Sequence, residues 1–403
     1  MQPATNTTIS GCAAKFRSSF LVAYIGSDQR LYQFEWDNNH WVTVDLISQW
    51  QSVVGITLPF PRTGSGPRSA GPIVMNTLDT DAPGDSSVYL CYIDTNGHIQ
   101  ALQFPLYDET ILPPGGSLLE AMNPDLTIRT GAPPAAAGSS IASYGWASQK
   151  SQHVVYVGTD GNVWELYWLE GQWDNVRGGP LWQANNLSER TGYLGELAPK
   201  KNGPMAATMF EREGTEHVVY IAADNTIREL YFYNGGWGGN NLTQAAGAAP
   251  PAANSPLAVY SADYEDTLHV VYLAEDGAIH ELWWNQSGWQ PDHAISQIYN
   301  PGPASNTALI GYACQYEQSH HVIYVDQTNS IQELYHNSNG WDITHLSLVA
   351  RDGFTTPINS ATPLAGYSFE ELQQQHIWYL DDQSRVHEIA RDKGQWYAIQ
   401  TFG

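Results

Sequence analysis

Short apolar runs separated by polar turns are the dominant pattern along this chain. Residues 269–274 form a β-branched and aromatic run, Glu275-Asp-Gly is a turn signal, and residues 278–284 form a second run. An earlier run at 256–260 predicts a preceding strand, and the segment from Trp289 predicts a following one. The runs are too short and too rich in β-branched residues to be helices. The pattern therefore predicts a four-stranded antiparallel unit.

The same unit recurs along the chain, with three residue types at fixed offsets from one tyrosine. In five copies a His lies three residues before the Tyr, a Glu nine residues after it and a Trp seventeen residues after it. The tyrosines are Tyr156, Tyr220, Tyr272, Tyr324 and Tyr379. The histidines are His153, His217, His269, His321 and His376, and the glutamates are Glu165, Glu229, Glu281, Glu333 and Glu388. The tryptophans are Trp173, Trp237, Trp289, Trp341 and Trp396. Matches at three offsets predict one repeated structural unit.

Two weaker copies precede these five, and they centre on Tyr24 and Tyr92. In the first copy Trp41 keeps its offset, but Leu21 and Gln33 replace the His and the Glu. In the second copy the residues at the three offsets are Tyr89, Ala101 and Glu109.

Neither face of the predicted hairpins is polar, so each sheet needs cover on both faces. Radial packing of blades supplies that cover, and no copy has the polar surface of a terminal repeat in an open stack. We predict an all-β, seven-bladed β-propeller of four-stranded antiparallel blades, in a single domain over residues 1–403. Six blades are the alternative, if one of the first two copies is only a partial unit. The predicted blades are approximately 13–50, 70–110, 135–185, 203–245, 254–297, 305–350 and 361–403.

Charge and composition narrow the possible partners. The net charge is −24 with only 17 Lys and Arg residues, which disfavours nucleic acid and anionic membrane surfaces. No stretch approaches the length of a transmembrane segment, and the polar N-terminus lacks the pattern of a signal peptide. We expect a protein that is cytoplasmic or released without a signal peptide.

Metals, cofactors and disulfides are not expected. Cys12, Cys91 and Cys314 are too few and too far apart for a disulfide framework, and we expect three buried free thiols. The repeated His and Glu lack the further oxygen or nitrogen ligands of a metal site. Asp79, Asp81 and Asp85 resemble a calcium loop, but the pattern occurs once, in the most divergent copy.

The repeated His and Glu are the candidate functional residues. Both are present in five copies and both are absent from the first two, which still have the blade pattern. A pair that is dispensable for folding and lost together indicates a shared binding site. The alternative is a His–Glu contact that stabilises each hairpin. A two-residue turn would place His and Glu on opposite faces of the blade, whereas a bulged turn would place them on one face.

These residue types suit sugar recognition. A carboxylate accepts two hydroxyl hydrogen bonds, an aromatic ring covers the apolar face of a pyranose, and His donates or accepts a further bond. The fifteen repeated His, Glu and Trp residues are therefore candidate carbohydrate ligands, although the Trp is equally compatible with a structural role. The turn residues Asp160, Asp224 and Asp276 are the next candidates.

The repeated motif of His-Val-Val-Tyr, Asp-Gly, Glu-Leu-Tyr/Trp and Trp resembles the β-propeller lectins of fungi and some bacteria. Over residues 13–403, and most strongly from residue 150, the chain is most similar to the Agrocybe-type mushroom lectins that recognise non-reducing terminal N-acetylglucosamine. The resemblance implies several sugar sites in clefts between consecutive blades. It also implies a multivalent agglutinin whose partners are glycoproteins with terminal N-acetylglucosamine or chitin-like oligosaccharides. The departures in the first two copies make those copies weaker candidates for sites.

Three other functions remain as alternatives. Fucose-binding propeller lectins typically have an Arg near the sugar, and only Arg228 directly precedes one of the five glutamates. A glycosidase needs one pair of carboxylates in a single site, whereas five equivalent positions suit multivalent binding, so we expect no enzyme. A protein-interaction propeller would explain the Trp-Asp dipeptides at 173–174 and 341–342, but the Gly-His signature of that class is missing.

Overall fold

The computed structural model describes residues 3, 7–14, 19–37, 40–46, 67, 71–78, 87–105, 125–174, 180–297, 302–349, 358 and 361–402. The chain is an all-β, seven-bladed β-propeller, and each of the seven copies forms its own antiparallel sheet. This confirms the prediction of seven blades over the alternative of six. The chain divides into two compact units, residues 1–186 and 187–403. The expected single domain stays a prediction, and each unit is described by itself.

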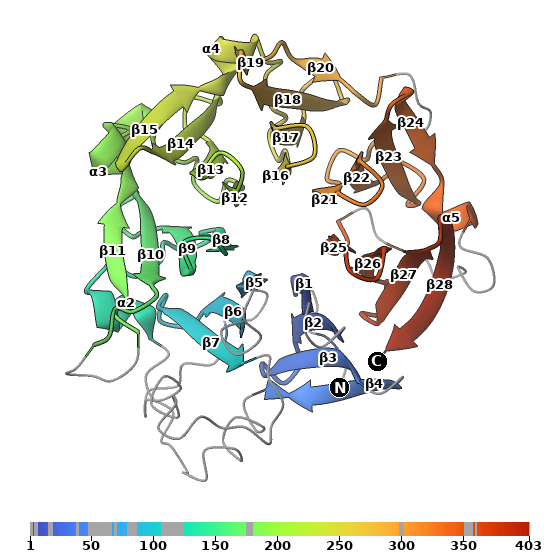
Figure 1. Ribbon diagram of the computed structural model, residues 1–403, viewed down its shortest axis with the longest axis horizontal. Helices are drawn as coiled ribbons and strands as arrows, with labels where there is room; N and C mark the ends of the chain where they lie inside the picture. Colours follow the sequence, from blue (N-terminus) through green and yellow to red (C-terminus); the bar gives the residue numbers. More distant parts are fainter. Residues whose placement is uncertain are drawn as a thin grey trace. The chain divides into compact units, whose positions relative to one another are not determined.

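The first unit contains three blades, whose strands follow one another in chain order across each sheet (Figure 1). Blade 1 consists of β1 (Ile9–Ala14), β2 (Ser19–Ile25), β3 (Leu31–Asp37) and β4 (His40–Asp45). Blade 2 has three strands within the described residues, β5 (Ile73–Leu78), β6 (Ser87–Ile93) and β7 (Ile99–Pro105). Blade 3 consists of β8 (Ile141–Trp146), β9 (Ser151–Val157), β10 (Val163–Leu169) and β11 (Gln183–Asn186), and helix α2 (Leu126–Thr130) precedes it. Glu109, Asp79, Asp81 and Asp85 lie outside the described residues.

The second unit contains four blades. Blade 4 consists of β12 (Met205–Phe210), β13 (Thr215–Ile221), β14 (Ile227–Tyr233) and β15 (Gly236–Asn241). Blade 5 consists of β16 (Leu257–Ala262), β17 (Thr267–Leu273), β18 (Ile279–Asn285), β19 (Gly288–Trp289) and β20 (His293–Ala294). Blade 6 consists of β21 (Leu309–Cys314), β22 (Ser319–Val325), β23 (Ile331–Asn337) and β24 (Gly340–Thr344). Blade 7 consists of β25 (Leu364–Phe369), β26 (Gln374–Leu380), β27 (Val386–Asp392) and β28 (Gln395–Phe402). The short helices are α3 (Leu187–Thr191), η4 (Gly195–Leu197), α4 (Leu242–Ala246) and α5 (Leu346–Val349).

The turn between the second and third strands of each blade is a three-residue turn with a bulge. In blade 3 the Gly158 N–H donates to Asn162 O at 2.9 Å and the Gly161 N–H donates to Gly158 O at 2.9 Å. Gly161 has φ +82°, as the left-handed position of such a turn requires. The turn pairs Val157 with Val163, and that pairing decides which residues of β9 and β10 share a face. Positive φ recurs at the corresponding position in all seven blades, at Gln29, Gly97, Gly161, Asn225, Gly277, Asn329 and Ser384.

The anchor tyrosines are part of the scaffold. All seven are at most 2% exposed, and several hydroxyls donate to the segment that precedes the first strand of the blade. Tyr156 donates to Pro133 O at 2.7 Å, and Tyr220 donates to Leu197 O at 2.9 Å. These bonds satisfy a polar group that burial would otherwise leave without a partner. In blades 3, 4 and 5 the tyrosine therefore ties the middle of the blade to its entry segment.

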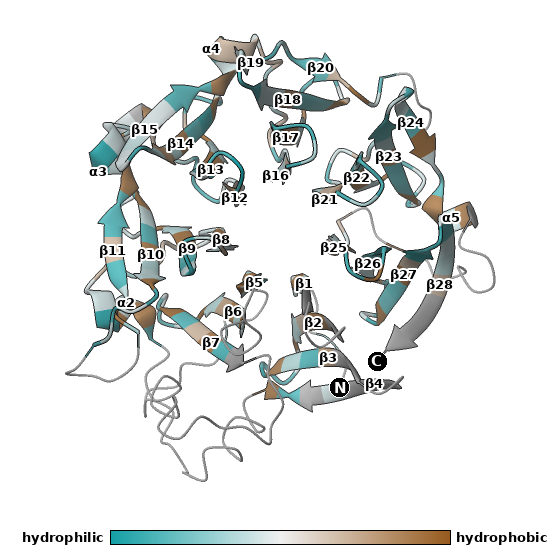
Figure 2. Ribbon diagram, viewed as in Figure 1, coloured by the Kyte–Doolittle hydropathy of each residue, from teal (hydrophilic) through white to brown (hydrophobic). Residues whose placement is uncertain are grey.

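Neighbouring blades of a unit cover each other's faces. In the second unit, one cluster joins Val219 of blade 4 to Val270 of blade 5, and the next joins Val271 of blade 5 to Val322 of blade 6. Strands that are buried on both faces contain polar as well as apolar residues, which Figure 2 shows as mixed teal and brown in β10 and β14. The three cysteines are buried, as expected. Among the described residues, no helix has the length and apolar character needed to cross a membrane.

Candidate functional site

In each of the five late copies the His and the Glu lie on the same face of the blade and are bonded to each other. His153 on β9 lies opposite Tyr167, while Glu165 on β10 lies opposite Val155. Val155 is two residues from His153, so His153 and Glu165 share a face. The His Nδ1 to Glu Oε1 distances are 2.8, 2.8, 2.9, 2.8 and 2.7 Å from blade 3 to blade 7. The bulged-turn alternative is therefore the one observed.

The second nitrogen of the histidine is also bonded in four of these blades. His153 Nε2 lies 2.8 Å from the Ser151 hydroxyl, and the same contact is 2.7 Å in the next three blades. Because the carboxylate can only accept, Nδ1 carries the proton and Nε2 accepts from the hydroxyl. A tyrosine on the first strand stacks on the ring, for example Tyr144 on His153 with centroids 4.8 Å apart. These contacts fix the orientation of the imidazole.

The second carboxylate oxygen is bonded as well in blades 3, 4 and 6. Glu165 Oε2 accepts from Asn185 Nδ2 at 2.8 Å, and Glu229 Oε2 accepts from Asn240 Nδ2 at 2.7 Å. Glu229 Oε2 also accepts from the indole N–H of Trp289 at 3.3 Å. Such complete pairing offsets the cost of burying a carboxylate.

Charge is retained on at least one of these buried carboxylates. Burial of Glu281 acts to raise its pKa, but the hydrogen bond from His269, together with electrostatic interactions with the neighbouring imidazoles, outweighs this effect. The pKa of Glu281 is consequently below its ordinary value.

The repeated tryptophan is not part of the His–Glu face of its own blade. Trp289 pairs with Trp284, which is three residues after Glu281 and so lies on the opposite face. It contacts Glu229 of the preceding blade instead, and Trp396 likewise donates to Glu333 Oε2 at 3.2 Å. The three predicted ligands of one copy are thus not brought together. The structure combines the His–Glu pair of one blade with the Trp of the next.

Burial separates the candidate ligands into two groups. None of the ten His and Glu residues is more than 9% exposed, whereas Trp237, Trp289 and Trp341 are half-buried. Trp173 lies outside the four strands of blade 3 and is 46% exposed, and Trp396 is buried. A ligand can reach the aromatic rim directly, but it reaches a carboxylate only by displacing an Asn or Trp. The observed His–Glu contact is the one that the hairpin-stabilising interpretation describes, and a sugar-contacting role for these residues stays a prediction.

A row of aromatic residues two positions after the glutamate was missed as part of the site. They share the face of the Glu because side chains in a strand alternate, and they are half-buried. The recurring Glu-Leu-aromatic triplet together with the period of two was the signal that could have found them. They are Tyr167, Tyr231, Trp283 and Tyr335, and blade 7 has Ala390 at this position.

The turn aspartates belong to the hairpin turns and bond to residues on the other face. Asp160 accepts from the Trp164 indole N–H at 3.0 Å, and Asp224 accepts from Arg228 Nη2 at 2.7 Å. Trp164 and Arg228 each directly precede a Glu, so their side chains point away from the His–Glu face. Arg228 is therefore separated from the carboxylate of Glu229.

Comparison with known proteins identifies the family. A model of the fungal fucose-specific lectin family matches residues 197–402, just over half of the chain. The chain belongs to this family. No curated protein matches its sequence.

Several solved lectin structures have the same fold. The BP39L lectin from Burkholderia pseudomallei superimposes with a TM-score of 0.68 at 13% identity, covering 100% of this chain and 99% of that one. AofleA from Arthrobotrys oligospora gives 0.52 at 15% identity, covering 85% and 87% of the two chains. The Aleuria aurantia lectin, a six-bladed β-propeller with a fucose recognition mode, gives 0.52 at 15% identity, covering 82% and 95%. Family and fold point to a carbohydrate-binding propeller lectin rather than an enzyme.

Among the described residues, three clusters of possible metal ligands lie inside one unit or the other. In the first, Asp94 and Asp125 accept the N–H groups of Asn96 and Ile128, so both carboxylates already cap local backbone. In the second, burial raises the pKa of the Cys314 thiol, which disfavours the thiolate that a metal needs. The third consists of Glu265, His269 and His320.

Proposed function

We propose that the chain is a multivalent lectin that binds non-reducing terminal N-acetylglucosamine in clefts between consecutive blades of a unit. The observation that supports it most directly is the pairing of Glu229 with Trp289 across blades 4 and 5. The pairing of Glu333 with Trp396 repeats it across blades 6 and 7. Each pairing brings a charged acceptor next to an aromatic ring, the combination that a pyranose needs.

The half-buried rim residues provide the entry to such a cleft. Between blades 4 and 5, Tyr231, Asn240 and Trp289 are half-buried, while Glu229 is 2% exposed. A sugar that packs its apolar face on an aromatic ring can offer a hydroxyl or acetamide N–H to Glu229 Oε2. It then replaces the bonds from Asn240 and Trp289, so the carboxylate keeps its partners throughout.

Fucose is the second candidate, because the matching family is described as fucose-specific. The residue bonded to the carboxylate is a His in all five late copies, whereas Arg228 lies on the opposite face with Asp224. We rank N-acetylglucosamine first because the resemblance of the repeated motif indicates it. Arg391, the strand partner of Trp396, interacts with Glu333 between blades 6 and 7 and supports fucose there. A protein-interaction propeller without sugar binding ranks third.

Calorimetric titration of the full chain with free monosaccharides tests this assignment. We expect N-acetylglucosamine to bind with a Kd of about 1 mM, as for a small polar site, and fucose to bind at least tenfold more weakly. Stronger binding of fucose would transfer the assignment to the second candidate. Binding of neither sugar, together with a blank glycan array, would contradict sugar recognition altogether.

A triple variant tests the position of the sites. Trp289→Ala, Trp341→Ala and Trp396→Ala together remove the aromatic ring from the three clefts inside the second unit. We expect fewer N-acetylglucosamine molecules bound per chain at saturation. Tyr397→Ala is the matched control, because Tyr397 is 46% exposed and alternates with Trp396 along β28. An unchanged stoichiometry in the triple variant would place the sugar elsewhere.

A further inference from the structure

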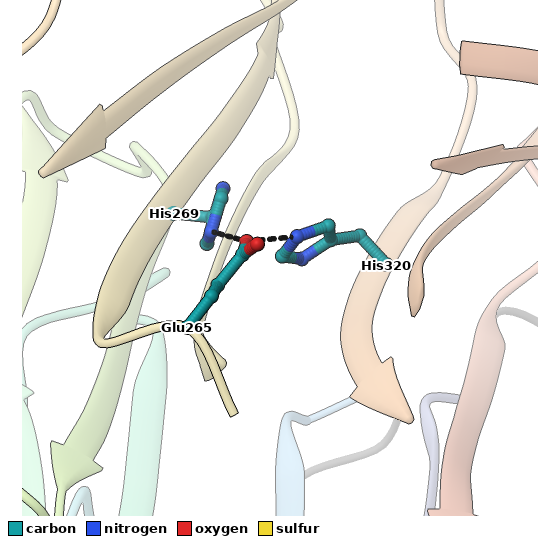
Figure 3. A group of neighbouring side chains, drawn as sticks. All are labelled: Glu265, His269 and His320. Atoms are coloured by element: carbon teal, nitrogen blue, oxygen red, sulfur yellow. Dashed lines mark hydrogen bonds and ion pairs between the residues drawn. The ribbon is translucent and has the colours of Figure 1, made fainter. Parts of the chain in front are cut away.

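Glu265, His269 and His320 converge between blades 5 and 6 (Figure 3). Glu265 lies in the turn between β16 and β17, His269 is on β17, and His320 is on β22 of the next blade. His320 Nε2 lies 2.5 Å and His269 Nε2 3.8 Å from Glu265 Oε1. Only Glu265 and His269 come from one blade, so the cluster forms when the two blades pack. Of the three, His269 alone belongs to the repeated pair, which is why the repeat gave no signal for this cluster.

Between blades 6 and 7, the residues at the equivalent positions form an ordinary ion pair. Glu317 of blade 6 corresponds to Glu265, since each is four residues before the repeated His. Glu317 accepts from Gln375 Nε2 at 3.2 Å and pairs with Arg391, both on blade 7. Gln375 and Arg391 correspond in the sheet to His320 and His336. A bridge between blades thus requires neither imidazole. Blades 5 and 6 differ by having a histidine at both of these places, and one of them, His320, faces Glu265.

His269 has the environment of a metal-ligating histidine. Its Nδ1 is bonded to Glu281 Oε1 at 2.9 Å, so a carboxylate fixes the tautomer and leaves the lone pair on Nε2. That lone pair now accepts from the Thr267 hydroxyl at 2.7 Å. Thr267 also lies 3.1 Å from Glu265 Oε1, so its hydroxyl has a second acceptor when a metal takes Nε2.

His320 and Glu265 supply the other two ligand atoms. His320 is 1% exposed, and its Nδ1 has no hydrogen-bond partner among the described residues. The Glu265 side chain is 39% exposed, which gives the cluster access to solvent. The Tyr264 hydroxyl, 2.9 Å from His320 Nε2, or a water is available as a fourth ligand.

We propose that Glu265, His269 and His320 bind one divalent transition-metal ion of the zinc class. Zinc bonds to nitrogen and oxygen are about 2.0–2.2 Å long, so tetrahedral ligand atoms lie about 3.4 Å apart. The present separations of 2.5 and 3.8 Å bracket that value, and small side-chain rotations bring the atoms into place. The ion would link blades 5 and 6, as Arg391 and Gln375 link blades 6 and 7. The proposal does not depend on which sugar is bound.

The test is a titration of the chelator-treated full chain with ZnCl2 by calorimetry, followed by Co2+ as a spectroscopic probe. We expect one tightly bound ion per chain, visible d–d absorption of tetrahedral Co2+, and a higher Tm with the metal. His320→Gln, which copies Gln375, is expected to bind at least tenfold more weakly and to lose the absorption. His293→Gln removes an exposed imidazole of blade 5 and serves as the control that keeps both properties.

A second variant keeps the test decisive if His320→Gln does not fold. Glu265→Gln changes a partly exposed turn residue, removes the charged ligand and is expected to weaken binding to a similar extent. Absence of a tight ion in the unmodified chain would overturn the proposal. Equal Zn2+ binding by the unmodified chain and a folded ligand variant would also overturn it. Monosaccharide titrations in the presence of chelator distinguish its failure from failure of sugar recognition.

Discussion

Blades 1 and 3 of the first unit have the same hairpin but different residues at the paired positions. Ala23 pairs with Gln33 in blade 1 as Val155 pairs with Glu165 in blade 3. Leu21 occupies the place of the histidine, is 4% exposed and belongs to an apolar cluster with residues of blade 2. The same backbone is therefore built around an apolar residue in one blade and around a hydrogen-bonded His–Glu pair in the other.

This difference shows which interactions a blade requires for folding and which it can accommodate. Burial of apolar strands on both faces is present in both blades, and it is the main favourable contribution to folding. The His–Glu pair adds polar groups that are acceptable only because each is bonded, through Ser151, Glu165 and Asn185. Gln33 of blade 1 has an Oε1 without a hydrogen-bond partner among the described residues. The pair is thus dispensable for the architecture. Its polar groups are fully bonded in blade 3 but not in blade 7, where Glu388 Oε2 has no hydrogen-bond partner among the described residues.

The largest effect is expected from breaking the pair in blade 3. Glu165→Ala removes the carboxylate that His153 Nδ1 and Asn185 Nδ2 contact and leaves a cavity. We expect the free energy of unfolding to fall by about 3 kcal/mol, as for other broken buried pairs. Denaturant titration followed by fluorescence and circular dichroism measures the loss.

Copying blade 1 into blade 3 is the matched control. The double variant His153→Leu with Glu165→Gln reproduces Leu21 and Gln33, and replacement of both partners is expected to cost about 1 kcal/mol or less. A double variant as unstable as Glu165→Ala would show that blade 3, unlike blade 1, requires the pair.

A smaller effect is expected in the turn that the two blades share. Gln29 in blade 1 has φ +63° where blade 3 has Gly161 at φ +82°. For a residue with a side chain, a left-handed backbone costs about 1–2 kcal/mol. Glycine avoids this cost, but its greater conformational freedom in the unfolded chain cancels part of the gain. We expect Gln29→Gly to raise the free energy of unfolding by about 0.5–1 kcal/mol and Gly161→Gln to lower it by a similar amount. Two changes of the same sign would contradict the equivalence of the turns.

The smallest effect is expected in the pH dependence of stability, at two equivalent positions in blades 5 and 7. His280 and His387 each directly precede the repeated Glu. Burial acts to lower the pKa of both. For His280 the bonds to Asp292 and Asp276 outweigh it and raise the pKa, whereas for His387 burial outweighs the bond to Asp381 and the pKa is lowered. The protonated His280 therefore stabilises the folded state below its ordinary pKa of 6.5. This stabilisation is lost as the pH rises through the higher pKa that His280 has in the folded protein. The neutral His387 contributes above pH 6.5, and that contribution is lost as pH falls.

Imidazole proton shifts measured by NMR test this order. We expect His280 to titrate above pH 6.5 and His387 below it. His280→Gln and His387→Gln serve to assign the two resonances. The reverse order of titration would show that the second carboxylate, Asp292, does not control His280.

The repeat, the strands and the scaffold positions were predictable from the amino-acid pattern alone. Fixed offsets from the seven tyrosines predicted seven blades, because a four-stranded unit of this kind buries its faces only against its neighbours. Burial of Tyr156 and its equivalents confirms the scaffold role of that position. The resemblance of the repeated motif also indicated the lectin family. The motif residues lie close together in the sequence, so they can be matched even where the overall identity is low.

How the repeated residues combine depends on strand register and on packing between blades. One bulged residue at Gly161 sets the register, and a shift of one residue would have moved Glu165 to the other face. The partner of Glu229 is Trp289, sixty residues away on the next blade, and no offset within a copy identifies it. The cluster of Glu265, His269 and His320 depends on how blades 5 and 6 pack. Local spacing specifies strands, but which side chains meet between blades is decided by register and packing.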